Sequence, residues 1–273
     1  MSKNDYRDLL RLQKFPPIWC AGCGNGIVLQ SLTRAVAKTG WDQDKICLVS
    51  GIGCSSRISG YADFNTLHTT HGRALTFATG IKMANPELHV IVVSGDGDAL
   101  AIGGNHFLHA ARRNVDLTYL IINNLIYGMT GGQASPATPT GKRATTSPYG
   151  HMDTPLDPCA LAIAAGAPFV ARSTTFDARN CEKYIRKGLE KPGFSVIEVA
   201  AACPTSYGRM NKCPDASGML LQQEADAMTV KQAAELPPEE VRDKVITGIL
   251  HNEDRPEASA AYHQMVAERS AGR

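Results

Sequence analysis

The sequence predicts an α/β protein with a doubly wound, mainly parallel sheet. Four short runs rich in valine and isoleucine recur along the chain, at 45–53, 89–100, 117–124 and 194–203. Their apolar residues do not alternate with polar ones, which is typical of strands buried on both faces of a parallel sheet. Longer segments of mixed character separate these runs, as expected of helices that connect parallel strands.

Three of the intervening segments have a helical pattern: "GIVLQSLTRAVAKTG" (26–40), "HGRALTFATGIKMAN" (71–85) and "GGNHFLHAARRN" (103–114). The last two end at asparagine, a residue tolerated at helix C-termini. In sheets of this type, ligands bind at the carboxyl ends of the strands. Residues 127–158 are dense in Gly, Pro, Ser and Thr, which predicts a functional or partner-covered loop.

Domain organisation follows from the change in composition near residue 210. We expect residues 1–210 to form one binding domain, and residues 211–273, which are polar and charged, to form a helical tail that packs on this domain or on a partner subunit.

The bulk composition excludes several classes of protein. The 273 residues carry a formal net charge of +2, which gives no argument for binding nucleic acid or an anionic membrane. No stretch approaches the roughly 20 apolar residues of a transmembrane helix, and the N-terminus does not resemble a secretion signal. We therefore expect a cytoplasmic protein whose eight cysteines are reduced and serve metal binding or catalysis.

Two oxygen donors follow neighbouring predicted strands. Asp96 lies in "GDGDALAIGG" after the strand "HVIVVS", and Asn124 closes the strand "LTYLIINN" 28 residues later. One carboxylate and one amide are suitable ligands for Mg²⁺, which keeps other positions for phosphate oxygens. Gly95 and Gly97 allow a diphosphate to approach the backbone beside a helix N-terminus. Gly-Asp-Gly alone is more often a simple strand-to-helix turn, but the paired asparagines favour the metal site.

Four cysteines form a second candidate site. Cys20 and Cys23 stand in "WCAGCGNG", whereas Cys54 and Cys203 each follow a predicted strand. The close pair alone is compatible with a metal site, a redox dithiol or two buried small residues. Four thiolates suit either Zn²⁺ or an iron–sulfur cluster, and the spacing does not choose between them. We expect the other cysteines to be ordinary core or surface thiols: Cys47, Cys159, Cys181 and Cys213.

Six segments together carry a resemblance to a known family: "WCAGCGNG", "GIGCSSR", "HGRALTFATGIKMANPE", "GDGDALAIGGNH", "NNLIYGMTGGQ" and "EVAAACPT". In this order they resemble the β subunit of the 2-oxoacid:ferredoxin oxidoreductases over about residues 15–210. The resemblance implies a thiamine-diphosphate-binding fold, with a [4Fe–4S] cluster on Cys20, Cys23, Cys54 and Cys203.

The resemblance also implies Mg²⁺ on Asp96, Asn124 and the backbone carbonyl of Ile126. Residues expected to bind the cofactors are Ile52, Gly53, Cys54, Ser55, His71, Gly95, Asp96, Gly97, Asp98, Asn124, Ile126, Gly128, Met129, Thr130 and Gly131. Ser56, Arg57 and Arg73 are further candidates near this site, although each arginine also suits an ordinary surface ion pair. For His71, a structural role is as well supported as a cofactor contact. In this family the activating glutamate comes from the α subunit, so we assign no catalytic base here.

The implied reaction is the oxidative decarboxylation of a 2-oxoacid with coenzyme A, and its electrons pass through the cluster to ferredoxin. Zinc has no redox chemistry and would not serve this purpose. Met129 stands where pyruvate-type relatives carry asparagine, which argues against pyruvate. The segment "IYGMTGGQ" is similar to enzymes that act on 2-oxoglutarate or branched 2-oxoacids, and we expect 2-oxoglutarate, with pyruvate or a branched 2-oxoacid as the alternative substrate. Two alternatives stay open: a non-oxidative thiamine-dependent decarboxylase or carboligase, and a non-catalytic zinc-bearing assembly subunit.

Overall fold

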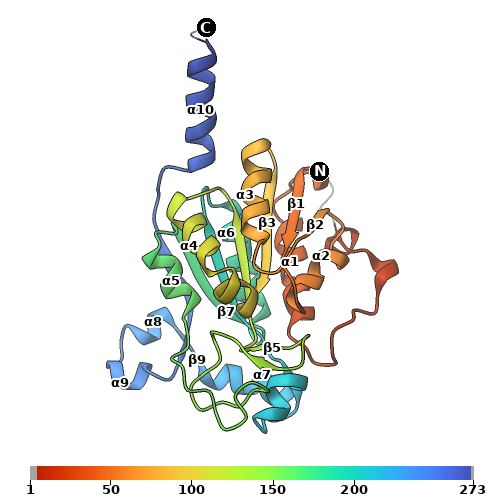
Figure 1. Ribbon diagram of the computed structural model, residues 1–273, viewed down its shortest axis with the longest axis vertical. Helices are drawn as coiled ribbons and strands as arrows, with labels where there is room; N and C mark the ends of the chain where they lie inside the picture. Colours follow the sequence, from red (N-terminus) through yellow and green to blue (C-terminus); the bar gives the residue numbers. More distant parts are fainter. Residues whose placement is uncertain (1–4, 272–273) are drawn as a thin grey trace.

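An eight-stranded sheet with helices on both faces forms the body of the computed structural model, which describes residues 5–271 (Figure 1). The strands of this sheet are β1 (Ile46–Ser50), β2 (Asn65–His68), β3 (His89–Gly95), β4 (Thr118–Asn123), β7 (Phe169–Thr174), β8 (Ser195–Ala200), β9 (Ala227–Thr229) and β10 (Val245–Asn252). A separate pair consists of β5 (Ile126–Tyr127) and β6 (Gln133–Ala134). The α-helices are α1 (Asn25–Ala37), α2 (Ile58–Tyr61), α3 (Ala74–Ala84), α4 (Gly104–Arg113), α5 (Pro158–Ala164), α6 (Ala178–Glu190), α7 (Ala216–Asp226), α8 (Val230–Ala233), α9 (Pro238–Val241) and α10 (Ala258–Ala271).

The strand order is β2-β1-β3-β4-β8-β7-β10-β9. The first six strands of this order pair in parallel, and β10 pairs antiparallel to β7. The doubly wound, mainly parallel architecture predicted from the sequence is therefore confirmed. All four strands and all three helices expected from the apolar pattern are present, with ends shifted by a few residues.

Successive residues of each central strand point to opposite faces and build two separate cores. In β1, Ile46 and Leu48 pack with residues of α1 and α6, while Cys47 and Val49 pack with residues of α3, α4 and α5. Both layers of helices are visible beside the sheet in Figure 1. Because the strands are covered on both sides, they need apolar residues at every position, which explains the continuous runs in the sequence.

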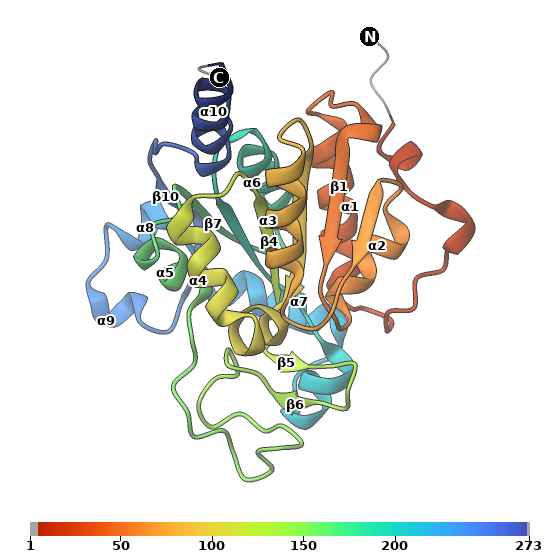
Figure 2. The same cartoon turned by 45° about the horizontal axis from the view of Figure 1, so that its top comes forward.

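Strands β3 and β4 are neighbours at the centre of the sheet, so the residues that follow them meet at one edge. The segment 127–158 extends from this edge as a long loop that contains β6 (Figure 2). None of the helices between residues 5 and 271 is both long enough and apolar enough to cross a bilayer.

The segment after residue 210 differs from the expected helical tail. It contributes β9 and β10 to the sheet, and α10 then projects away from the body (Figure 1). Strand β10 has a mostly half-buried pattern rather than a buried one, so its sequence lacks the dense apolar run that marks the central strands. Residues 1–4 and 272–273 of the two expected domain ranges lie outside the described residues.

Candidate cofactor and metal site

A cavity of about 510 Å³, measured to its open mouth, lies at the carboxyl ends of β1, β3 and β4. Its walls come from the three loops that follow these strands and from the segment around His71. The residues that line it are Ile52, Gly53, Cys54, Ser55, His71, Gly95, Asp96, Gly97, Asp98, Asn124, Ile126, Tyr127, Gly128, Met129 and Thr130. Of the residues expected to bind cofactors, only Gly131 does not line this cavity. Tyr127 lines it and was not among the expected residues.

Three oxygens converge at the floor of the cavity. Oδ1 of Asn124 lies 3.1 Å from Oδ1 of Asp96 and 2.7 Å from the carbonyl oxygen of Ile126. Rotating the amide by half a turn would place its NH₂ group there and convert both contacts into hydrogen bonds. The observed orientation instead lets the N–H of Ile126 donate to Asn124 Oδ1 at 3.3 Å. The side-chain amide of Asn124 thus lies between two acceptors, a position that suits its NH₂ group when no cation is bound and its oxygen when a cation is bound.

Asp96 is almost completely buried. Burial raises the pKa of its carboxyl group to about 6, although hydrogen bonds from the Ser135 hydroxyl and the Asn124 N–H act in the opposite direction. Ser135 belongs to the long loop, so the loop is tied directly to the candidate metal ligand. No feature of the sequence distinguishes Ser135 from the other hydroxyl residues of that loop.

Asp98 also lies at the cavity, but the chain's own groups occupy its carboxylate. Oδ1 accepts from the N–H groups of Gly72 at 2.7 Å and Ile52 at 3.2 Å, and Oδ2 accepts from the Ser94 hydroxyl at 2.6 Å. Nδ1 of His71 lies 2.7 Å from the same Oδ1, although its N–H does not point along the line between the two atoms. Asp98 therefore holds together three segments that form the cavity wall.

The other polar candidates lie at different distances from the cavity. The Ser55 hydroxyl lines it beside Gly95, whereas Ser56 is fully buried and does not line it. Arg73 donates to the His71 carbonyl at 3.0 Å. Arg57 is exposed and does not line the cavity, although its charge lowers the pKa of Cys54, which does. The structure thus brings Ser55 and His71 to the cavity and leaves the two arginines outside its lining.

The four expected cysteines gather beside this cavity. Cys54 lines it directly, and a side chain on Gly128 would come within 3.5 Å of Cys54 Sγ and 3.9 Å of Cys203 Sγ. The turn that holds Cys20 and Cys23 is fixed next to Cys203, because the N–H of Gly24 donates to the Ala202 carbonyl at 3.0 Å. No three of the four sulfurs lie within 4.8 Å of one another.

Burial and repulsion between neighbouring thiolates set the pKa values of these cysteines. The pKa of Cys54 is raised to about 11, mainly by burial and secondly by the neighbouring thiolates. Burial also raises the pKa of Cys23. Two further contacts fix these residues. The indole N–H of Trp19 donates to the Cys54 carbonyl at 2.7 Å, and the amide of Asn25 donates to Cys23 Sγ at 3.3 Å. The remaining four cysteines are buried or half-buried and free.

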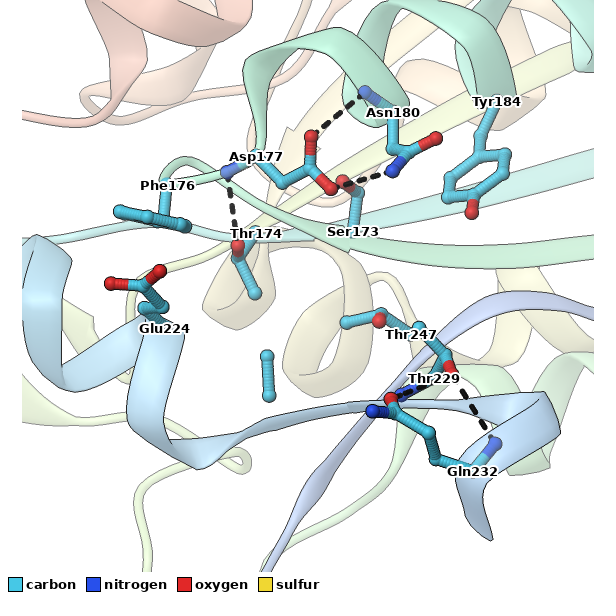
Figure 3. A pocket seen from close by; sticks show the side chains of 11 residues that line it. Ser173, Thr174, Phe176, Asp177, Asn180, Tyr184, Glu224, Thr229, Gln232 and Thr247 are labelled. Carbon is cyan, nitrogen blue, oxygen red and sulfur yellow. Dashed lines mark hydrogen bonds between the residues drawn. The ribbon is translucent and has the colours of Figure 1, made fainter. Parts of the chain in front are cut away.

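A second cavity, of about 540 Å³, lies between the N-terminus of α6 and the C-terminal strands (Figure 3). Its polar side chains largely bond to one another: Asp177 accepts from Asn180, and Thr229 pairs with Gln232. None of the expected site residues lines it. We therefore place the candidate functional site in the first cavity, where the oxygens of Asp96, Asn124 and Ile126 lie close to the cysteines.

Among residues 5–271, the one group of carboxylate, thiol and histidine side chains with ligand atoms close enough for a shared metal ion consists of Asp157, Cys159 and Glu198. Arg172 already pairs with both carboxylates, at 2.5 Å and 2.6 Å. The guanidinium group therefore supplies the positive charge in this cluster.

Comparison with known proteins agrees with this geometry. The family model described as the thiamine pyrophosphate enzyme, C-terminal TPP binding domain, matches residues 51–199. The 2-oxoglutarate synthase subunit KorB of Methanothermobacter thermautotrophicus is 48% identical over 268 residues, which cover 98% of this chain and 94% of that protein. The chain belongs to the β subunits of the 2-oxoacid:ferredoxin oxidoreductases.

Other members of the family support the assignment. The KorB subunit of Archaeoglobus fulgidus is 61% identical to this β subunit over 203 residues, covering 74% of this chain and 76% of that protein. A solved structure of 2-oxoglutarate:ferredoxin oxidoreductase from Magnetococcus marinus, with 2-oxoglutarate, coenzyme A and succinyl-CoA bound, has a TM-score of 0.88 and 32% identity. That match covers 99% of this chain and 92% of the other. The family resemblance and the fold predicted from the sequence are confirmed.

Proposed function

We propose that this β subunit binds thiamine diphosphate through Mg²⁺ and carries a [4Fe–4S] cluster, within an enzyme that converts 2-oxoglutarate and coenzyme A to succinyl-CoA and CO₂. The electrons leave through the cluster to ferredoxin, and the same enzyme can run in the reductive direction. The observation that carries the proposal is the position of the Asn124 side-chain amide between Asp96 Oδ1 and the Ile126 carbonyl, in a cavity edged by cysteines.

Mg²⁺ suits this group of oxygens. Ligands at right angles around Mg²⁺ are about 3 Å apart, because each metal–oxygen distance is about 2.1 Å. The separations of 3.1 Å and 2.7 Å are close to this value. Without a cation, three acceptors facing one another would repel, which explains why hydrogen bonding alone would favour the rotated amide. Asp96, Asn124 and the Ile126 carbonyl would hold the metal, and its other positions stay open for phosphate oxygens.

Backbone groups next to the metal ligands suit a diphosphate. Gly128, Met129 and Thr130 line the cavity, and within residues 5–271 their N–H groups find no acceptor. The N–H of Gly131 instead donates to the Gly128 carbonyl at 3.3 Å, so Gly131 shapes the turn rather than offering a donor. Unpaired N–H groups in a tight turn form a site for anions. These three residues therefore orient the diphosphate while the metal neutralises its charge.

The spread of the cysteines supports a cluster rather than zinc. Sulfurs that share one tetrahedral zinc ion are about 3.8 Å apart, since each zinc–sulfur distance is about 2.3 Å. No three of the four sulfurs come within 4.8 Å of one another. A four-iron cluster spreads its ligands more widely because each thiolate binds a different iron. The wider spacing thus favours [4Fe–4S] over the zinc-bearing assembly subunit.

The position of the cysteines suits electron transfer from the cavity. Bound thiamine diphosphate supplies an electron sink for the carbanion equivalent left by decarboxylation. Cys54 lines the cavity itself, and Cys203 lies close to Gly128, which also lines it. A non-oxidative thiamine-dependent decarboxylase would need no such thiols. The juxtaposition therefore favours an oxidative enzyme, in which the α subunit completes the site and ferredoxin receives the electrons.

The preference for 2-oxoglutarate rests on the relatives and on Met129. Four of the similar proteins are named 2-oxoglutarate synthase subunits, at 47% to 61% identity, and the similar solved structure holds 2-oxoglutarate. Met129 lines the mouth of the cavity and is 42% exposed, so its side chain is placed to contact a substrate or the partner subunit.

The test uses the enzyme purified anaerobically with its native α subunit. Thiamine diphosphate, Mg²⁺ and coenzyme A are added, and the visible absorption of the cluster is followed as 2-oxoglutarate, pyruvate and 2-oxoisovalerate are supplied separately. We expect a brown protein that is bleached fastest by 2-oxoglutarate. An Asp96→Ala variant should stay brown but should not bleach, because it loses the cofactor and keeps the cluster.

Two outcomes would contradict the proposal. A colourless protein that contains zinc by elemental analysis would assign the cysteines a structural role. Equal bleaching by all three acids would remove the preference for 2-oxoglutarate while leaving the electron path intact.

A further inference from the structure

A series of buried polar contacts connects the start of α5 with three neighbouring strands and ends at the segment after β4, which carries two of the proposed Mg²⁺ ligands, Asn124 and Ile126. Its members lie on β7, β8 and β4, which are adjacent in the sheet, and Arg172 and Glu198 are direct cross-strand partners. Glu198 is 3% exposed. A charged residue in the centre of a sheet is unusual unless all of its hydrogen-bonding capacity is used.

Both oxygens of Glu198 are occupied. Oε2 accepts from Nε of Arg172 at 2.6 Å and from the thiol of Cys159 at 3.2 Å. Oε1 accepts from the side-chain amide of Asn123 at 2.8 Å. Arg172 also donates to Asp157 at 2.5 Å. Burial by itself would lower the pKa of the Arg172 guanidinium group, but the neighbouring carboxylates of Glu198 and Asp157 raise that pKa above its ordinary value.

Asn123 connects Glu198 to the backbone of the next segment. Because Glu198 is an acceptor on both sides, the NH₂ group of Asn123 faces it, and Oδ1 faces the other way. That oxygen accepts from the N–H of Leu125 at 3.2 Å. Leu125 has a φ of +65°, a left-handed conformation that leucine rarely adopts. The Asn123 side chain therefore closes a turn around a strained residue.

Leu125 lies between two of the proposed Mg²⁺ ligands in the sequence. The side chain of Asn124 precedes it and the carbonyl of Ile126 follows it, and their oxygens are 2.7 Å apart. A change in the backbone at Leu125 would move these two oxygens relative to each other. The Leu125 carbonyl is held from the opposite side by the Thr138 hydroxyl at 2.6 Å, so Asn123 fixes the N–H side of the same residue.

We propose that Glu198, oriented by Arg172, is a positioning residue that sets the geometry of the Mg²⁺ site through Asn123 and Leu125. This inference rests on the proposed binding of Mg²⁺ and thiamine diphosphate. Glu198 touches neither group, and its role is to hold the amide of Asn123 in one orientation. Glutamine at this position has the same shape but offers an acceptor on one side only, so either Arg172 or Asn123 would face another donor.

The experiment measures metal affinity rather than turnover. The complex with the α subunit is stripped of metal with EDTA, and binding of thiamine diphosphate at a fixed concentration is followed by tryptophan fluorescence while Mg²⁺ is added. We expect Glu198→Gln to raise the apparent Mg²⁺ dissociation constant by about 10- to 100-fold, as observed for other groups that orient metal ligands. Asn123→Ala should give a similar increase while leaving the Arg172–Glu198 pair intact.

A matched control separates positioning from general stability. Lys82, which is buried, and Asp116, which is half-buried, form another ion pair with a nitrogen–oxygen distance of 2.6 Å, near the start of β4 and outside the lining of the cavity. Asp116→Asn breaks this pair and should lower the melting temperature of the metal-free complex without changing the Mg²⁺ constant. The melting temperature of each metal-free variant is measured alongside, so a loss of folding is recognised directly.

The outcomes distinguish the inference from the proposed function. If Glu198→Gln and Asn123→Ala both keep a Mg²⁺ constant within twofold of the unaltered enzyme, the positioning role is wrong and the proposed function stands. An increase in all three variants alike would also overturn the positioning role, because it would reflect stability alone. If the unaltered complex shows no Mg²⁺-dependent binding of thiamine diphosphate, the proposed function itself is overturned.

Discussion

The aromatic ring of Tyr127 lies directly over the backbone of Gly97. A Cβ atom on Gly97 would sit 2.2 Å from Cε1 of Tyr127, and the Tyr127 hydroxyl donates to the Gly97 carbonyl at 3.0 Å. Both residues line the candidate cavity, and the ring also makes an edge contact with His71, with 5.9 Å between the ring centroids. This contact, together with the hydrogen bond from the Asn124 N–H to Asp96, holds the segment that follows β3 against the segment that follows β4.

We predict that Gly97→Ala displaces Tyr127 and disturbs the cavity. The methyl group would overlap the ring, so the turn around Asp96 has to move. Because small displacements of reacting groups reduce rates strongly, turnover of the complex should fall by roughly 100-fold. The measurement is the steady-state rate of ferredoxin reduction.

Gly80→Ala is the control for this prediction. Gly80 lies in α3, and a Cβ atom added to it would meet no other atom within 4 Å. Alanine there should increase stability by about 0.5–1 kcal/mol and leave turnover unchanged. Normal turnover in Gly97→Ala would show that the contact with Tyr127 does not shape the site.

We predict that Asp96→Asn stabilises the metal-free protein and removes cofactor binding. The amide replaces one of the clustered oxygens, Asp96 Oδ1, with a donor that can face Asn124 Oδ1, and it removes a buried charge, so the melting temperature in EDTA should rise. Binding of thiamine diphosphate in the presence of Mg²⁺, measured by calorimetry, should be lost. A variant that binds the cofactor as tightly as the unaltered chain would rule out Asp96 as a metal ligand.

We predict that Asp98→Ala lowers the melting temperature of the metal-free protein, whereas Asp96→Asn raises it. The N–H groups of Gly72, in a buried hydrogen bond, and of Ile52, in a partly buried one, lose their acceptor. Leaving such donors unpaired costs about 1–3 kcal/mol each, so the melting temperature in EDTA should fall clearly. If Asp98→Ala loses cofactor binding without any loss of stability, Asp98 contacts the cofactor directly and does not hold the segments of the cavity wall together.

The pH dependence of stability should include a contribution from Asp157. Burial alone would raise the pKa of its carboxyl group, but Arg172 and the N–H groups of Cys159 and Ala160 bring it below its ordinary value of 3.8. A lowered pKa in the folded state means that the stabilisation is present above the ordinary value and is lost as the pH falls through the folded value. Glu198 and Cys159 also face Arg172 and remain in place.

Asp157→Asn tests this contribution, because asparagine still caps α5 but carries no charge. The difference in melting temperature between the variant and the unaltered chain should be largest at pH 7 and should shrink below pH 4. A difference that is independent of pH over this range would mean that the charge of Asp157 adds no stability.

Sequence patterns alone predicted where the proposed Mg²⁺ ligands lie, because both side-chain ligands follow strands. Asp96 and Asn124 come directly after apolar runs, and parallel strands bring such residues to one edge of the sheet. Cys54 and Cys203 follow the same rule. These four residues could therefore be placed near one another without knowing any contact between side chains, whereas the other expected cofactor contacts came from the family resemblance.

Residues that act through tertiary contacts could not be identified in this way. Tyr127, Ser135 and Glu198 occupy positions that the sequence pattern does not distinguish from their neighbours. Glu198 even interrupts an apolar strand, and its role depends on Arg172, which lies on a strand that the pattern missed. Strand β2 was missed because it is short and mostly exposed. Strand β10 was missed because half-buried residues give only a weak apolar signal.

The amide of Asn25 should influence the proposed cluster. Asn25 is 1% exposed and donates to Cys23 Sγ at 3.3 Å, while its own side-chain oxygen has no hydrogen-bond partner among the described residues. Hydrogen bonds to ligand sulfurs are one determinant of the potential of iron–sulfur clusters. An N–H group directed at the sulfur stabilises the reduced state, which carries more negative charge.

We predict that Asn25→Leu lowers the midpoint potential of the cluster. Leucine fills a similar volume without an N–H group, and the amide oxygen that it removes was unpaired, so the main change is the loss of one bond to sulfur. The potential is measured by a redox titration followed by electron paramagnetic resonance, with iron content determined in parallel. Asn180→Leu is the control, since Asn180 also lies near a helix start but donates to Asp177 instead of a cysteine. An unchanged potential in Asn25→Leu with full iron content would show that this contact does not tune the cluster. Equal shifts in both variants would show a general effect of losing an asparagine side chain from the first turn of a helix.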